Sequence, residues 1–238
     1  MKINKLSDAV LTHLIGAIQL VLIIFLISYV LNLNKRLKTI DKKLAGVDLP
    51  VKKTPERVSV KADSLSPAVG SEKATVTMTI FSDFECGFCK VFATTIFPQL
   101  KKRYVDKGLV KVNFRHLPLE FHKNALMAAE ASACAQEQGQ FWDLHDYLFN
   151  NQSKLDSSLI FTWASKKRLN LAQFNGCIIN HTYKSRVEKD MQEATMAGLK
   201  GTPAIIINDN LIMGARSYEH FAEMIEQELS KTCADCAL

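Results

Sequence analysis

The sequence carries almost no net charge beyond its first 56 residues. Residues 1–56 hold nine Lys and Arg against four Asp and Glu, whereas residues 57–238 hold 21 against 20. A nucleic-acid-binding domain needs a basic face of its own, so we expect no nucleic-acid partner. The basic excess lies around an apolar stretch instead, which favours contact with anionic membrane lipid. Internal repeats and low-complexity tracts are also absent, and a chain of 238 residues can bury one good core.

An uncharged run near the N-terminus lacks the features of a cleaved signal. From Ala9 to Leu31 no side chain carries a formal charge, and no A-x-A-like site follows the run. About 20 apolar residues cross a bilayer as a helix, so the run is long enough. We predict an uncleaved transmembrane anchor over residues 1–31, in a single-pass protein of the cytoplasmic (inner) membrane. A cleaved signal peptide is the alternative.

The charges beside this run disagree with the orientation that the cysteines favour. Two lysines precede the run and five Lys or Arg follow it within residues 35–43, and a count of positive charges would place the following domain in the cytoplasm. The number of cysteines, six, is even and suits an oxidising compartment. Because long domains can be translocated despite flanking charge, we expect residues 57–232 on the extracytoplasmic, periplasmic side.

Residues 32–56 form a polar, Lys-rich connector. Apolar residues recur at spacings of three and four from the end of the predicted anchor into this connector, at Val30, Leu33, Leu37, Ile40, Leu44 and Val47. This heptad-like stripe covers only about two heptads, fewer than a convincing coiled coil needs. A solvated helical stalk and a stalk that joins copies of the chain through residues 30–47 both fit the pattern.

The next segments alternate between strand and helix patterns. Val58–Lys61 fits a short edge strand. Ala74–Phe81 and Gly108–Phe114 predict strands on either side of a helix, and Gly87–Tyr104 has the apolar spacing of that helix. A strand, a helix and a strand within about 40 residues make a βαβ unit, which implies a parallel strand pair with a right-handed crossover.

Residues from about 120 to 200 lack strand signals and contain helix formers, which predicts a helical insert. The candidate helices are Asn124–Gln138, Gln140–Asn150, Ser157–Lys167, Leu171–Ile179 and Tyr183–Leu199. A Gly-Thr-Pro break ends this run. Ala204–Asn208 and Leu211–Met213 then predict a hairpin, and Ser217–Ser230 predicts a final amphipathic helix. The expected order of the α/β domain is therefore βαβ, helical insert, ββα.

A Cys-x-x-Cys pattern, Cys86-Gly87-Phe88-Cys89, directly follows a predicted strand and opens a predicted helix. A thiol at a helix N-terminus meets unpaired N–H groups and the positive end of the helix dipole, which lower its pKa. We therefore predict that Cys86 is the exposed nucleophile and that Cys89, one turn further on, resolves mixed disulfides. We expect no cofactor. A zinc site would need two more ligands at short spacing, which His116 and His122 do not supply, so we also expect no metal.

Gly201-Thr202-Pro203, before an apolar strand, is the second signal. Proline is tolerated at the start of a strand, and a cis bond there would be a purposeful feature. With cis geometry, the backbone of Thr202 is exposed to pair with an extended substrate beside Cys86, and Pro203 keeps metal-binding groups away from the thiols. Alone, this tripeptide is an ordinary loop ending. Its combination with a strand, a Cys-x-x-Cys and a helix gives it weight.

Three segments together resemble the DsbA family of thioredoxin-like proteins over about residues 57–231. They are Ile80–Cys89 (IFSDFECGFC), Glu137–Trp142 (EQGQFW) followed by His145-Asp146, and Gly201–Pro203. The resemblance implies that Cys86 attacks or donates the disulfide, that Cys89 resolves it, and that Thr202 and a cis Pro203 hold the substrate. It also implies an extracytoplasmic domain that acts on unfolded exported proteins, and a membrane quinone-linked partner that reoxidises the pair.

The direction of electron flow is left open by the residues between the cysteines. Many strong oxidases of the family carry Pro-His there, whereas Gly87-Phe88 offers no donor, and the neighbouring Glu85 opposes a negative sulfur. Thr202 before the proline is common among related isomerases. We expect an oxidase, with an isomerase or reductase of the same fold, or a non-enzymatic metal-handling scaffold, as alternatives.

Four cysteines remain outside the redox pair. Cys134 and Cys177 both fall in the predicted insert, where a structural disulfide and two buried free thiols are both compatible with the sequence. Cys233 and Cys236 form a second Cys-x-x-Cys, in a tail of residues 233–238 after the last predicted helix. A local disulfide, an electron relay to the first pair and adventitious metal binding all fit this tail.

Overall fold

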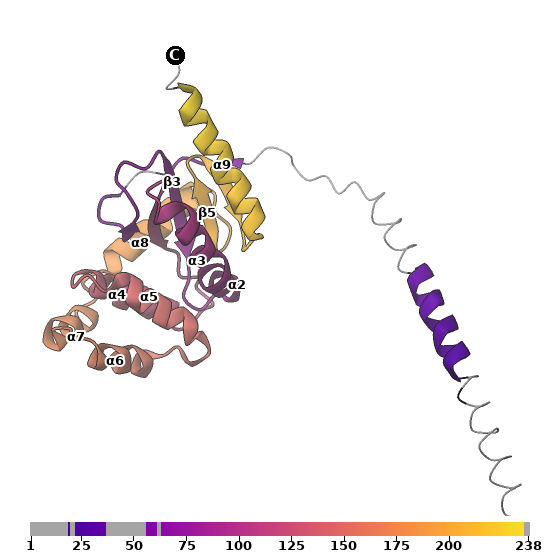
Figure 1. Cartoon of the computed structure of the whole chain (residues 1–238). Helices are drawn as coiled ribbons and strands as arrows, with labels where there is room; N and C mark the ends of the chain where they lie inside the picture. Colours follow the sequence, from indigo (N-terminus) through magenta and orange to yellow (C-terminus); the bar gives the residue numbers. More distant parts are fainter. Residues whose placement is uncertain (1–18, 20–21, 37–55, 61–62, 236–238) are drawn as a thin grey trace, which may run out of the picture. The chain divides into compact units, whose positions relative to one another are not determined.

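The computed structural model describes residue 19 and residues 22–36, 56–60 and 63–235. The chain divides into two compact units, Met1–Lys53 and Thr54–Leu238 (Figure 1). In the first unit, residues 22–36 are helical and their large apolar side chains are exposed. Most of the predicted anchor (residues 1–31) and of the predicted connector (residues 32–56) lies outside the described residues. Within the described ranges, no helix is both long enough and apolar enough to cross a membrane.

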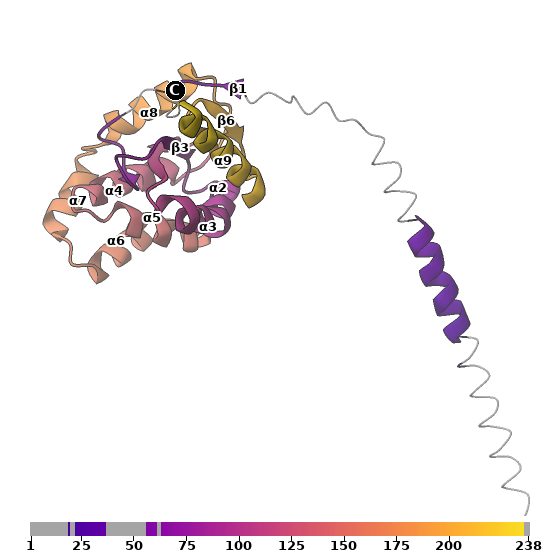
Figure 2. The same cartoon turned by 45° about the horizontal axis from the view of Figure 1, so that its top comes forward.

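The second unit is built on a six-stranded sheet with the order β1-β6-β5-β3-β4-β2 (Figures 1 and 2). The strands are β1 (Glu56–Arg57), β2 (Ala68–Val69), β3 (Val76–Ser82), β4 (Val110–His116), β5 (Ala204–Ile207) and β6 (Asn210–Met213). Strands β3 and β4 are parallel, and every other neighbouring pair is antiparallel. The predicted βαβ unit and hairpin are therefore confirmed.

Two short strands differ from the prediction. The edge strand lies at Glu56–Arg57, residues 58–60 of the predicted Val58–Lys61 are not in a strand, Lys61 lies outside the described residues, and β2 was not predicted. Val58 is buried, and its N–H donates to the carbonyl oxygen of Asp209 at 2.8 Å without extending the ladder. Strands of two residues depend on the neighbouring strand and have no periodicity of their own, so a pattern search cannot find them.

The helix that follows β3 is continuous but not uniformly α-helical. It consists of α2 (Gly87–Val91), the π-helical turn η1 (Phe92–Ile96), α3 (Phe97–Leu100) and a second π-helical turn, η2 (Lys101–Val105). Pro98 stands in its middle and has no N–H to donate to the preceding turn. Widened π-helical turns on both sides of the proline let the helix continue through it.

The helical insert is confirmed, with each helix within three residues of its predicted bounds. It contains α4 (Ala125–Gln136), α5 (Phe141–Asn150), the short 3₁₀ helix η3 (Gln152–Lys154), α6 (Ser157–Lys166), α7 (Leu171–Ile179) and α8 (Lys184–Met196). Side chains of Asp156 and Asn170 cap α6 and α7 by accepting hydrogen bonds from backbone N–H groups of the first turn. Figure 1 shows α4 to α7 gathered at one side of the unit.

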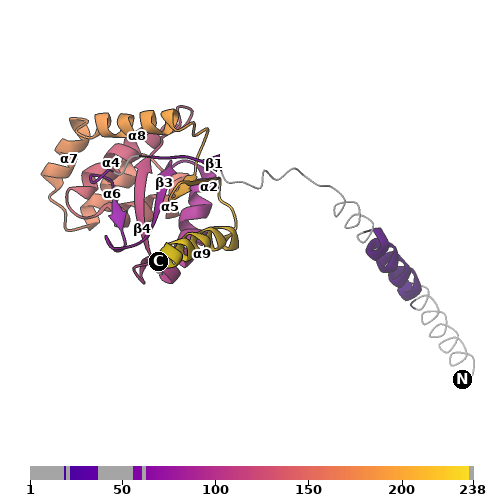
Figure 3. The same ribbon diagram turned by 90° about the horizontal axis from the view of Figure 1, so that it is seen from above.

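Both faces of the sheet are covered. Figure 3 shows α8 on one side of β3 and β4 and the last helix, α9 (Tyr218–Asp235), on the other. On the α8 side, buried Arg115 of β4 pairs with Asp190 of α8 at 2.6 Å and with Glu193. The backbone N–H of His116 also donates to Asp190, at 2.9 Å. These paired charges fix α8 on the sheet, because a buried charge without its partner is strongly destabilising.

Helix α9 is longer than the predicted Ser217–Ser230. It continues to Asp235, so Cys233 lies in the helix and the prediction that it stands in a tail after the last helix is wrong. Adding a residue to an existing helix costs little compared with starting one, which explains why the helix runs past its apolar stripe. Cys236 lies outside the described residues.

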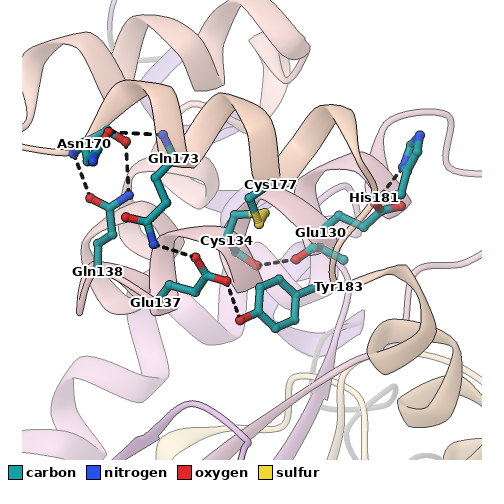
Figure 4. Close-up of a disulfide and its surroundings, with 11 residues drawn as sticks. Glu130, Cys134, Glu137, Gln138, Asn170, Gln173, Cys177, His181 and Tyr183 are labelled. Carbon is teal, nitrogen blue, oxygen red and sulfur yellow. Dashed lines mark hydrogen bonds and ion pairs between the residues drawn. A yellow bond between two sulfur atoms is a disulfide. The ribbon is translucent and has the colours of Figure 1, made fainter.

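Cys134 of α4 and Cys177 of α7 form a disulfide inside the insert (Figure 4). Side-chain hydrogen bonds surround it: Glu137 accepts from Tyr183 at 2.7 Å and from Gln173 at 2.9 Å, and Gln138 exchanges two hydrogen bonds with the backbone of Asn170. Both sulfur-bearing residues are buried. The disulfide is therefore part of a broader junction between α4 and α7.

Replacing both cysteines, Cys134→Ala with Cys177→Ala, should lower the free energy of unfolding. The disulfide closes a loop with a sequence separation of 43, and chain entropy predicts a loss of about 4 kcal/mol for a loop of that length. Denaturant unfolding of the variant and of the parent chain, followed by circular dichroism, measures the difference. An unchanged midpoint would show that the surrounding hydrogen bonds alone hold α4 to α7.

Candidate redox site

The redox pair lies where β3 passes into α2. After Ser82 the chain turns, with the Cys86 N–H donating to the Asp83 carbonyl oxygen at 3.2 Å, and Cys86 becomes the N-cap of α2 in extended conformation. The carbonyl oxygen of Cys86 accepts the first hydrogen bond of the helix, from Lys90 N–H at 3.1 Å. Both Cys86 and Cys89 are free thiols and both are buried; Cys86 is 7% exposed, so the prediction that it is exposed is wrong. The strand therefore delivers the first sulfur to the N-terminus of the helix.

The surroundings of Cys86 favour the thiolate. A hydrogen bond from the Cys89 thiol is the main cause that lowers the pKa of Cys86 from 9.0 to about 5. Burial opposes this shift, whereas Thr202 and the backbone N–H groups of Cys89 and Phe88 add to it. The last two groups belong to the open first turn of α2. At neutral pH, Cys86 is therefore a reactive anion.

The pKa of Cys89 is shifted in the opposite direction. Its side chain is 1% exposed, and burial, followed by the neighbouring Cys86, raises its pKa well above 9.0. Outside the pair, the backbone N–H of Asp83 donates to its sulfur at 3.5 Å, and this bond and the Ser82 side chain oppose the rise in pKa only weakly. Two thiols three residues apart are thus held in different protonation states. This difference lets one sulfur attack while the other stays in reserve.

The structure places the Gly201–Pro203 segment beside the redox pair. The Cys86 sulfur lies 3.4 Å from the carbonyl oxygen of Thr202, across 116 residues of sequence, and the Thr202–Pro203 peptide bond is cis. The hydroxyl of Thr202 is buried and makes no hydrogen bond of good geometry with a described residue. Its effect on the pKa of Cys86 is therefore weaker than that of Cys89. The carbonyl of Pro203 is occupied by Gly214 N–H at 2.8 Å, which fixes the start of β5.

Asp83 organises the turn between β3 and α2. Its buried carboxylate accepts hydrogen bonds at both oxygens. One oxygen accepts from Glu85 N–H at 2.7 Å, and the other from Leu119 N–H at 2.7 Å and from the His122 ring at 2.8 Å. The role of His122 was not apparent from sequence, because its partner lies 39 residues away.

His116 stands at the end of β4, in register with Ser82 at the end of β3. It is 1% exposed, and neither ring nitrogen has a hydrogen-bond partner among the described residues. Burial, followed by the charges of Arg186 and Arg115, lowers its pKa to about 3. The ring is therefore neutral, and it packs against Phe84 and Phe114 at centroid distances of 6.3 and 5.3 Å.

No group of three or more His, Cys, Asp or Glu that could hold a metal ion occurs within the part of the chain that is described. Of the remaining predicted residues, Cys134 and Cys177 pair with each other inside the insert. Cys233 is placed only as part of α9, and Cys236 is not described.

A family model and several known proteins are similar to this chain in sequence. A family model described as thioredoxin covers residues 63–227. Disulfide bond formation protein D of Bacillus subtilis is 32% identical over 172 residues, which are 68% of this chain and 77% of that protein. The Na(+)/H(+) antiporter NhaA 3 of Salinispora tropica is 32% identical over 163 residues, but the chain spans only 23% of its length.

Solved structures give the same result. Oxidised BdbD from Bacillus subtilis has a TM-score of 0.65 and 31% identity, and the match covers 74% of this chain and 98% of that one. Alpha-DsbA1 of Wolbachia pipientis has a TM-score of 0.68 at 23% identity, covering 74% of this chain and 97% of that one. The second similarity is one of fold.

The alkylation rate of the reduced protein should depend on pH with a midpoint near the lowered pKa of Cys86. Since its pKa is about 5, we expect a rate that is level above about pH 6 and that falls about tenfold per unit below pH 4. Stopped-flow alkylation with mass-spectrometric identification of the modified cysteine makes the measurement. Cys86→Ser should remove the fast phase, and Cys89→Ala, which deletes the main donor, should raise the midpoint. A midpoint near 9 would contradict an activated thiol.

Proposed function

Because the chain belongs to the DsbA-like family of thioredoxin-fold thiol:disulfide oxidoreductases, we propose that it introduces disulfides into exported proteins through Cys86 and Cys89. The observation that carries the proposal is the opposed shift of two neighbouring pKa values, lowered for Cys86 and raised for Cys89. A stabilised Cys86 thiolate favours the reduced form of the pair, and a pair that favours reduction oxidises its substrates.

The reaction takes two exchanges. A substrate thiolate attacks the Cys86 sulfur of the Cys86–Cys89 disulfide, so a substrate–Cys86 bond forms while the bond to Cys89 breaks. Cys89 leaves as a thiolate and takes up a proton, as its raised pKa requires. A second substrate thiolate then attacks the substrate sulfur and releases the Cys86 thiolate. The low pKa of Cys86 makes it a good leaving group. Two electrons pass from the substrate to the pair. The substrate thiols lose two protons, of which Cys89 takes up one and the solvent the other, because Cys86 stays a thiolate.

Thr202 and Pro203 would hold the substrate during these steps. The Thr202 carbonyl lies 3.4 Å from the Cys86 sulfur, so an extended peptide paired with this backbone would present its sulfur to Cys86. Pro203 supports this role, since its side chain adds neither a thiol nor a metal ligand beside the reacting sulfurs. Main-chain pairing also suits an enzyme that acts on many unfolded sequences.

An isomerase or reductase of the same fold is the second candidate. Gly87 and Phe88 give the Cys86 thiolate no side-chain donor, so its stabilisation depends on Cys89, on Thr202 and on backbone N–H groups. The pair would then be less oxidising than one with a charged donor between its cysteines.

The proposal includes a membrane anchor, an extracytoplasmic location and a partner that reoxidises the pair. The anchor would comprise residues 1–31, and the exposed apolar side chains over residues 22–33 support contact with lipid. A catalytic domain on the extracytoplasmic side would meet exported proteins as they emerge unfolded, and a quinone-linked membrane partner would reoxidise Cys86 and Cys89. Association of copies through residues 30–47 stays a prediction, because most of that stripe lies outside the described residues.

The reduction potential of the pair tests the direction of electron flow. For an oxidase we expect a value well above the roughly −270 mV of thioredoxin, measured by equilibration with glutathione buffers. A value at or below that of thioredoxin would favour the reductase.

The C-terminal cysteines provide a second arm of this measurement. Glu228 of α9 bonds Asn208 and Asn210 at the β5–β6 turn, away from Pro203, and Cys233 stands about 20 Å along α9 from its start. Replacing Cys233 and Cys236 with serine should therefore leave the potential and the rate of the first turnover unchanged. A slower first turnover would favour the relay interpretation of the tail.

A further inference from the structure

The redox loop, residues 84–86, is held by a side chain of the helical insert. Gln152 of η3 lies 66 residues after Cys86, and its amide nitrogen donates to the Cys86 carbonyl oxygen at 2.9 Å and to the Phe84 carbonyl oxygen at 2.8 Å. Both hydrogens of one amide group are thus directed at the backbone of this loop. Gln152 itself is half-buried.

A second tie joins the same loop to the insert. The Glu85 carboxylate accepts from the backbone N–H of Asn124 at 2.5 Å and from the Asn124 side-chain amide at 3.1 Å. That amide also donates to the Leu155 carbonyl oxygen at 2.9 Å, and Leu155 N–H donates to the Gln152 carbonyl oxygen at 3.1 Å. The hydrogen bonds therefore form a closed ring.

This ring of hydrogen bonds includes the carbonyl group of Cys86, whose orientation affects how well the thiolate is stabilised. The Cys86 carbonyl oxygen is shared between Gln152 and the first helical hydrogen bond of α2, from Lys90 N–H. The N–H groups of Phe88 and Cys89 that stabilise the Cys86 sulfur belong to the same first turn. Their direction toward that sulfur depends on the orientation of the Cys86 peptide unit. A donor that fixes the Cys86 carbonyl therefore fixes the geometry of the thiolate site.

We propose that Gln152 is a positioning residue for Cys86, through which the helical insert holds the nucleophile in its reactive geometry. Gln152 touches neither sulfur and acts through two backbone carbonyls. The proposal goes beyond the direction of electron flow, because disulfide donation and disulfide reduction both need the Cys86 thiolate. It also gives the insert a part in the chemistry, in addition to its part in covering the sheet.

Gln152→Met tests the proposal, because methionine keeps the length of the side chain and removes both donors. The matched control is Gln138→Met, which removes an amide that bridges α4 and Asn170 within the insert, next to the Cys134–Cys177 disulfide (Figure 4). Both variants lose hydrogen bonds of the insert, but only the first loses contact with the redox loop. For each full-length variant, the pH dependence of Cys86 alkylation and the melting temperature are measured.

We expect Gln152→Met to raise the alkylation midpoint of Cys86 by about one pH unit, so that the thiolate fraction below that midpoint falls about tenfold. The control should keep the parent midpoint even where its melting temperature falls as far. Gln152→Leu, which also removes both donors and adds no charge, should shift the midpoint in the same direction and serves if the methionine variant folds poorly.

Two outcomes would overturn the proposal. One is a Gln152→Met protein with a lowered melting temperature and an unchanged alkylation profile, which would make Gln152 a purely structural contact. The other is an equal shift in the Gln138→Met control, which would mean that any loosening of the insert reaches Cys86. Because the alkylation assay uses no protein substrate or redox partner, it reports on positioning even if the proposed oxidase direction is wrong.

Discussion

The chemistry of this domain depends on a difference between two sulfurs three residues apart. Cys86 is the N-cap of a helix and accepts a hydrogen bond from the Cys89 thiol, which lowers its pKa. Cys89 is 1% exposed, and burial raises its pKa because a charged sulfur would lose its contact with water. The first thiol ionises easily and the second does not. Other parts of the fold serve this difference: β3 brings Cys86 to the start of α2, and β5 brings the Thr202 carbonyl to 3.4 Å from its sulfur.

Sequence patterns were sufficient for the frame of the molecule. The strands β3 and β4, the insert helices and the hairpin each have a local periodicity, and the Cys-x-x-Cys has a position between strand and helix that carries its own physical meaning. The resemblance to a known family added the approach of Thr202 to Cys86, which no local rule predicts. The two-residue strands and the end of α9 were missed, since neighbouring elements or helix propagation determine them.

The residues that hold the redox site in place through hydrogen bonds were the hardest to predict from sequence. The carboxylate of Asp83 binds Leu119 and His122, which lie 36 and 39 residues away in the sequence. Gln152 looks like an ordinary polar residue after a helix, and its contact with Cys86 spans 66 residues. Contacts between distant side chains and backbone carbonyls leave no periodicity in a sequence. They appear only once the insert has been folded against the βαβ unit.

The Cys134–Cys177 disulfide makes this chain a recipient of the reaction that its family carries out. A newly synthesised copy begins with both of these thiols reduced, and it lacks the cross-link between α4 and α7 until an oxidant supplies it. The young protein therefore passes through a weaker form before it matures. Once made, the bond is buried, with Cys134 at 1% and Cys177 at 7% exposure, so reductants and neighbouring copies reach it poorly.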